Sequence, residues 1–207
     1  VTQLPDNSGN TNPNYGTADY NNILDGQGLY VTRSDPSYVG TFLFENNVCV
    51  NNGKNGINFD NSLSASAIYQ NNTLYYNGVH EIIQDLSVAE GNPPHRGQKV
   101  GGIKANKVQN ATVVNNIVVT RDNEFSALSL NNIDNPETVD PETGEPDYDG
   151  IKIATNNIFL NGTVAYPGNQ EPANLINIDP EFVNVPSVVN GAIDINQTNF
   201  KLAEGSP

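Results

Sequence analysis

A pair of asparagines set between apolar residues recurs along the chain, and its spacing constrains the fold more than any other feature. Asn21-Asn22, Asn46-Asn47 and Asn71-Asn72 follow one another at 25-residue intervals, and later copies end at Asn116 and Asn157. A period of roughly 20 to 50 residues is typical of repeat proteins, in which each unit buries its apolar face only against its neighbours. The spacing therefore predicts a stack of similar coils.

A second set of segments alternates apolar and polar residues with the two-residue period of a β-strand. Both sets end at turn signals such as Asn52-Gly53 and Asn77-Gly78. The pattern predicts an all-β fold of about six to eight coils of parallel strands with almost no helix. The apolar positions expected to face inward are Leu29, Val31, Ile57, Phe59, Ile103, Ala105, Leu128 and Leu130.

The chain holds 35 asparagines among 207 residues, and this excess needs a structural reason. A short amide tolerates the left-handed backbone of a corner and offers both a donor and an acceptor there. Amides stacked at the strand spacing of about 4.8 Å can also bond to one another as a ladder. Structure is thus expected to account for most of the asparagine. The single cysteine, Cys49, lies in a Val-Cys-Val segment and is expected to be a buried thiol.

These repeats resemble the bacterial-type right-handed parallel β-helix proteins, which include many polysaccharide lyases. The resemblance rests on the segment from Glu45 to Ile57, on Asp25-Gly-Gln-Gly-Leu29, and on a terminal pattern, Asp179 to Asn184 followed by Thr198 to Pro207. In such proteins the terminal pattern is similar to a closing coil. The fold expected from the resemblance is a right-handed parallel β-helix.

The resemblance covers residues 19–207, with inserted loops expected near residues 86–100 and 131–150. Residues 1–18 are interpreted as a polar N-terminal segment or a preceding coil. The resemblance implies a secreted or cell-surface protein, and the absence of methionine is consistent with a processed segment. It leaves the activity open, because the same scaffold carries lyases, hydrolases, epimerases, adhesins and fibres.

The charge of the chain narrows the classes of partner. The net charge is −14, and only nine residues are Lys or Arg, so binding to nucleic acid is not expected. The same negative charge argues against binding to anionic lipid. The sequence has no run of about 18 apolar residues, so membrane insertion is not expected. An acidic polysaccharide is compatible with this charge only where a local basic cleft or bound divalent cations neutralise it.

Aligned by their inward residues, the alternating segments bring outward residues together in columns on one face. A coil from Val79 to Leu86 is expected between the second and third segments and contributes His80, Glu81 and Asp85. The three columns are Tyr30, Asn58, Lys104 and Ser129; Thr32, Asp60, Asn106 and Asn131; and Arg33, Asn61, Lys107 and Asn132.

For this face the resemblance implies β-elimination from a uronic acid, in which a base removes the proton α to a neutralised carboxylate. Calcium is the expected cofactor. The loop Gly91-Asn-Pro-Pro-His-Arg-Gly beside the face adds two candidates, and the acidic insert that ends at Gly150 has an oxygen-rich composition that suits calcium. The catalytic candidates are Lys104 and Lys107, the substrate-binding candidates Arg33, His80, His95 and Arg96, and the metal candidates Asp60, Glu81 and Asp85.

Other functions remain open at this point. A non-catalytic extracellular solenoid, such as an adhesin, a fibre subunit or a glycan-binding module, fits the sequence equally well, and such a protein could self-assemble through its ends. A hydrolase requires two carboxylates at a defined separation, which a sequence does not give. Phosphate-binding loops, a Gly-x-Ser-x-Gly elbow and Cys-x-x-Cys pairs are absent from the sequence.

Overall fold

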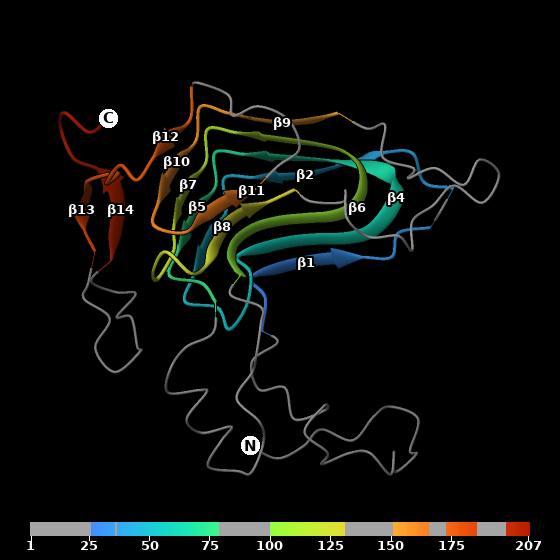
Figure 1. The fold of residues 1–207 in the computed structure, drawn as a ribbon, viewed down its shortest axis with the longest axis horizontal. Helices are drawn as coiled ribbons and strands as arrows, with labels where there is room; N and C mark the ends of the chain where they lie inside the picture. Colours follow the sequence, from blue (N-terminus) through green and yellow to red (C-terminus); the bar gives the residue numbers. More distant parts are fainter. Residues whose placement is uncertain (1–25, 36, 79–99, 131–150, 166–172, 186–197) are drawn as a thin grey trace, which may run out of the picture.

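The computed structural model describes residues 26–35, 37–78, 100–130, 151–165, 173–185 and 198–207. Within these ranges the protein is all-β and contains no helix, as the alternating segments predict. Two parallel sheets face each other across the core, and a small antiparallel sheet lies to one side (Figure 1). The His80, Glu81, Asp85, His95 and Arg96 candidates and both predicted inserts lie outside the described residues, apart from Val100 at the end of the first insert.

The first sheet consists of parallel strands that pair in chain order. Its main path runs through β1 (Leu29–Thr32), β4 (Ile57–Gln70), β6 (Val100–Val114), β8 (Ser126–Ser129) and β11 (Thr163–Ala165). Strands β4 and β6 are long and bend midway (Figure 1). Beyond the bend, β2 (Thr41–Glu45) pairs with β4, and β9 (Lys152–Thr155) pairs with β6.

The second sheet repeats the same logic with short strands. Its order is β12 (Leu175–Ile176), β10 (Ile158–Leu160), β7 (Ile117–Val119), β5 (Thr73–Tyr75) and β3 (Val48–Val50), and all pairs are parallel. Parallel neighbours require the chain to return to the same end between strands. Here it returns through the first sheet, either as one long strand, β4 or β6, or as two short ones, β8 and β9.

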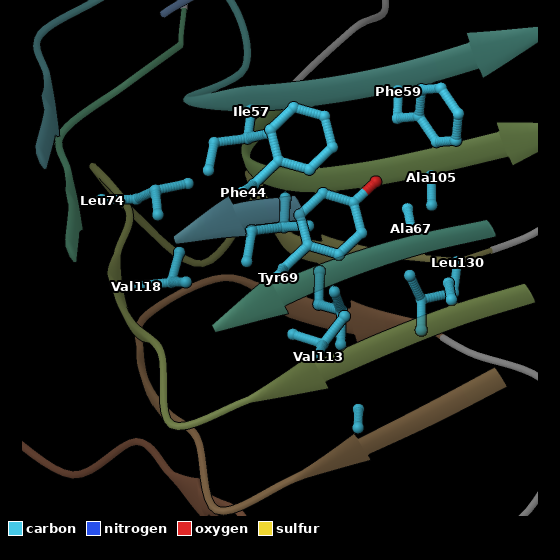
Figure 2. Close-up of a cluster of buried hydrophobic side chains, with 14 of the residues drawn as sticks. Phe44, Ile57, Phe59, Ala67, Tyr69, Leu74, Ala105, Val113, Val118 and Leu130 are labelled. Atoms are coloured by element: carbon cyan, nitrogen blue, oxygen red, sulfur yellow. The ribbon is translucent and has the colours of Figure 1, made fainter. Parts of the chain in front are cut away.

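Apolar side chains from both sheets fill the space between them (Figure 2). The rings of Phe44 and Tyr69 stack with centroids 5.0 Å apart and planes within 8°. The predicted inward direction is confirmed: Leu29 and Val31 pack against this core while partly buried. Buried completely or nearly so are Cys49, Ile57, Phe59, Ile103, Ala105, Leu128 and Leu130.

The two members of each Asn-Asn pair have different tasks. The first adopts a left-handed backbone, as at Asn46 (φ 57°) and Asn115 (φ 55°), which asparagine tolerates better than most residues. The second is buried in Asn72, Asn116 and Asn157 and partly buried in Asn47. Its backbone N and side-chain Nδ2 donate to the Oδ1 of the next, at 2.8 to 3.0 Å. This ladder runs through Asn47, Asn72, Asn116, Asn157 and Asn174. The predicted stacking of asparagine amides is confirmed.

The second sheet is apolar on both faces, and the C-terminal strands explain why. Its strands read as continuous apolar runs such as Ile117-Val-Val119, which is typical of parallel strands covered on both sides. Part of the outer face, at Tyr75, lies against β13 (Phe182–Asn184) and β14 (Asn199–Leu202), which pair antiparallel, whereas Val48 of β3 is 57% exposed. The rings of Phe182 and Phe200 lie 6.3 and 5.5 Å from that of Tyr75.

The terminal segments therefore do not form the closing coil expected from the resemblance. That expectation was wrong: β13 and β14 pair antiparallel in a sheet of their own, and their aromatic rings lie against Tyr75 of β5. Figure 1 shows these two strands beside β12 and β10 rather than in line with the other strands.

Candidate functional site

The pairing of β1, β4, β6 and β8 places the predicted outward columns side by side. Tyr30 pairs with Asn58, Asn58 with Lys104, and Lys104 with Ser129. Thr32 pairs with Asp60, which pairs with Asn106. The first predicted column is thus confirmed in full, and the second as far as Asn106, since Asn131 lies outside the described residues. We call the surface formed by these seven residues the polar face.

The third column lies at the bend of the strands and shares one backbone conformation. Arg33, Asn61 and Lys107 have φ values of 55°, 54° and 54°. Left-handed backbone costs about 1 to 2 kcal/mol for a residue with a side chain other than Asn or Asp. The bend requires it here because β1, β4 and β6 turn at equivalent positions. Arg33 and Lys107 are therefore at the edge of the polar face, two strands apart.

Asp60 lies at the centre of the polar face and is held by two amides. Its Oδ1 accepts a hydrogen bond from the Asn106 Nδ2 at 2.7 Å, and its Oδ2 accepts one from the Asn61 Nδ2 at 3.1 Å. Because neutral amides donate these bonds, Asp60 contributes a negative charge to a face that also carries the Lys104 ammonium. Among the described residues, these two hydrogen bonds hold the carboxylate in place.

The described part of the chain does not make a calcium site by itself. It contains no group of three His, Cys, Asp or Glu side chains placed to hold a metal. Asp60 is the one predicted metal ligand it includes, since Glu81 and Asp85 lie outside it. Two amides already donate to the Asp60 carboxylate.

Asn58 differs from the solvent-facing residue that the alternation predicts. It is only 4% exposed, and its buried Oδ1 accepts no hydrogen bond. Such an acceptor costs about 1 to 3 kcal/mol relative to a satisfied one, so its presence in a native protein calls for a reason. The paired neighbours of Asn58 on the face are Tyr30, which is half exposed, and Lys104.

Lys152 belongs near this face, and sequence reasoning missed it. Its Nζ donates to the backbone oxygens of Val108 and Gln109, at 2.9 and 2.7 Å, directly after the bend at Lys107. Burial lowers the pKa of Lys152 to about 8. The feature that could have revealed Lys152 is its strand position, because it pairs with the fully buried Ala111 and so occupies an inward column. The two hydrogen bonds of its Nζ connect the bend of β6 to β9.

No family model, curated protein or solved structure matches this chain. The described residues also include no helix long and apolar enough to cross a membrane. The chemistry of the polar face is therefore judged from its own residues. It offers an exposed aromatic ring, an unsatisfied amide acceptor, a cation and a hydroxyl in one row across four paired strands.

Proposed function

We propose that this chain is a right-handed parallel β-helix that binds an acidic polysaccharide along its polar face. The sequential parallel order of both sheets supports the fold, because each pass from strand to parallel strand in one sheet is right-handed in about 98% of known cases. The continuous asparagine ladder supports it too, since it needs successive coils in register.

One observation carries the functional proposal: the row Tyr30, Asn58, Lys104 and Ser129 is in register across four strands. An extended polysaccharide presents ring faces, hydroxyls and carboxylates along a line, and neighbouring strands lie about 4.8 Å apart. The Tyr30 ring suits the apolar face of a sugar. The Asn58 Oδ1, which is buried in the unbound protein, accepts from a sugar hydroxyl once the side chains that cover it move aside. The Lys104 side chain pairs with a carboxylate as an ammonium, or takes the proton as a neutral amine.

We propose β-elimination as the reaction of this face, with Lys104 or Lys107 as the base. The base takes the proton from the carbon α to the uronate carboxylate. The electron pair of that C–H bond forms the double bond to the β carbon, and the glycosidic oxygen on the β carbon leaves and is protonated. Arg33, at the edge of the face, neutralises the carboxylate as negative charge develops on it.

A non-catalytic glycan-binding solenoid is the second candidate, and the bonds of Asp60 favour it. A carboxylate whose two oxygens each accept from a neighbouring amide, Asn106 or Asn61, is a rigid recognition element. In this case the polar face binds the polymer and leaves it intact. Secretion and self-assembly through the ends of the stack accompany this role as further proposals.

Incubation with pectate, alginate and related polyuronates separates the two roles. Elimination leaves a carbon-carbon double bond conjugated to the carboxylate, so the product gains ultraviolet absorbance. We expect that gain in the wild type and its loss in Lys104→Ala or Lys107→Ala. Lys201→Ala, an exposed lysine on β14, is the matched control and should leave it unchanged.

Polysaccharide retained without an absorbance gain favours the binding module. A lack of both retention and absorbance across the panel contradicts the proposed function. Calcium binding through Asp60, Glu81 and Asp85 stays a separate prediction. A cation bound to the native state raises the melting temperature, and equal melting in millimolar calcium and in chelator contradicts it.

A further inference from the structure

The charged residues of the polar face and its bend lie on separate strands. Among the four strands that form the face, β4 has one charged residue, Asp60, and β6 has two, Lys104 and Lys107, whereas β1 and β8 have none. Asn58 pairs with Lys104 and Asp60 with Asn106, so β4 and β6 are direct neighbours (Figure 1). A ligand that crosses the face therefore meets an anionic strand and a cationic strand about 4.8 Å apart.

Asn58 and Asp60 on β4 both present hydrogen-bond acceptors. The buried Oδ1 of Asn58 accepts no hydrogen bond from the described residues. The two carboxylate oxygens of Asp60 accept one amide bond each, at 2.7 and 3.1 Å, and an ionised carboxylate has about four acceptor sites in all. Residues two apart on a strand lie on the same side of the sheet. The part of a ligand over β4 therefore has to supply donors.

The same strand disfavours a carboxylate of the ligand. A carboxylate over β4 would face the Asp60 carboxylate and the Asn58 oxygen, neither of which can donate a hydrogen bond to it. Like charges repel, and the repulsion grows where the site excludes water. In a homopolymer of uronic acid every sugar carries a carboxylate, so a chain that places one carboxylate at Lys104 brings the next one toward β4.

The strand on the other side of Lys104 is also without a cation. Lys104 pairs there with Ser129 of β8, which contributes a hydroxyl and no charge. In the row from Tyr30 to Ser129, Lys104 is thus the single cation, and it has a neutral or anionic neighbour on each side. The row matches one carboxylate between two uncharged sugars better than a carboxylate on every sugar.

We infer that the polymer bound by this face alternates uronic acid with a neutral sugar that is rich in hydrogen-bond donors. This inference rests on the proposed function and narrows its substrate class. The uronate lies over β6 with its carboxylate at Lys104. The neutral sugar lies over β4, where its hydroxyl or amide N–H groups donate to Asp60 and, once it is uncovered, to the Asn58 Oδ1. Asp60 determines specificity because its charge excludes a second carboxylate.

Two charge-neutralising substitutions isolate the role of Asp60. Asp60→Asn removes the charge and keeps an oxygen that accepts from the Asn106 Nδ2. Asp179→Asn is the matched control, since Asp179 is an exposed aspartate between β12 and β13, and its Oδ1 accepts from the Glu181 backbone N at 2.8 Å. Both variants raise the net charge by the same amount, so a difference between them reports on the position of the charge.

Calorimetric titration of the full chain compares two oligosaccharides of equal length at one ionic strength. In hyaluronan, glucuronate alternates with N-acetylglucosamine, and in polygalacturonate every sugar is a uronate. The wild type should bind the hyaluronan oligosaccharide about ten-fold more tightly, because like charges placed across an interface are costly. In Asp60→Asn, polygalacturonate binding should strengthen until the two affinities agree within about two-fold. Asp179→Asn should keep the wild-type difference.

The possible outcomes separate this inference from the proposed function. A wild type that binds polygalacturonate as tightly as hyaluronan, or a difference that survives Asp60→Asn, overturns the inference and leaves the polysaccharide site in place. A lack of binding to both polymers contradicts the proposed function and the inference with it. If Asp60→Asn loses its far-ultraviolet dichroism, Asp60→Ser, whose hydroxyl also accepts from Asn106, takes its place with the same expected results.

Discussion

Asn116 and Asn115 are adjacent and identical in type, yet the structure predicts opposite consequences of replacing them. Asn116 is fully buried, and its Oδ1 accepts from the N and Nδ2 of Asn72 at 3.0 and 2.8 Å. Its Nδ2 donates to the Tyr69 backbone oxygen at 2.9 Å. Asn116→Leu keeps a similar size but leaves the Asn72 backbone N without an acceptor. It also removes one donor from the Tyr69 oxygen.

The expected loss follows from these two groups. A buried polar group left without its partner costs about 1 to 3 kcal/mol, so Asn116→Leu should lower the free energy of unfolding by about 3 kcal/mol. This is a large share of the roughly 5 to 15 kcal/mol that stabilises a typical domain. Asn115 is exposed with φ 55°. Glycine adopts this conformation freely, so Asn115→Gly should change the free energy by no more than about 0.5 kcal/mol.

Urea denaturation followed by far-ultraviolet circular dichroism measures both values. The wild type and the two variants should unfold with the same dependence on urea, so that midpoints report stability. A loss below about 1 kcal/mol for Asn116→Leu, or equal losses for both variants, would refute the separation of tasks within the Asn-Asn pair.

Three more predictions concern packing and titration. In Gly102→Ala, the new Cβ would clash with the Ala127 backbone oxygen, so we expect no folded protein by circular dichroism, and a wild-type melting temperature would contradict this close approach. Phe200→Ala should lower the free energy of unfolding by about 2 kcal/mol because it removes a partly buried ring. Val183→Ala on the paired strand, where the side chain is 53% exposed, should lower it by less than about 0.5 kcal/mol. Equal losses of stability in urea would argue against docking of β13 and β14 on the second sheet. Burial lowers the pKa of Lys152 from 10.5 to about 8, so between these values the unfolded chain holds a proton that the folded chain has released, and stability relative to Lys152→Met should rise with pH across that window. A difference between the two urea curves that stays flat with pH would contradict it.

Local periodicity made much of the fold predictable. The inward direction of Ile57 and Phe59 follows from alternation within one strand. The stacking of the asparagines follows from the repeat, which marks equivalent positions along the chain even though the bonded residues are 25 to 44 positions apart. The register of Asn58 with Lys104 followed from aligning those inward residues. The right-handed parallel β-helix itself stays a proposal.

Long-range contacts made the remainder unpredictable. The docking of Phe200 beside Tyr75 depends on the outer face of the second sheet, which is built from residues far apart in the sequence. Burial of Asn58 does not follow from strand alternation, which placed it in solvent. Lys152 was readable as a lysine in an inward column, but its carbonyl partners lie more than 40 residues away.

Calorimetric titration of uronate oligosaccharides into the full-length protein tests the polar face most directly, when Asn58→Leu and Lys104→Ala are compared with the wild type. If the Asn58 Oδ1 accepts a hydrogen bond from a sugar hydroxyl in the complex, Asn58→Leu should weaken binding about ten-fold, or about 1.4 kcal/mol. The same substitution should not lower the free energy of unfolding, because it removes an unsatisfied buried acceptor. Lys104→Ala should weaken binding at least as much and reduce its dependence on salt. Binding that is unchanged in both variants, or an Asn58→Leu protein that binds normally and unfolds more easily, would contradict a polysaccharide site on this face.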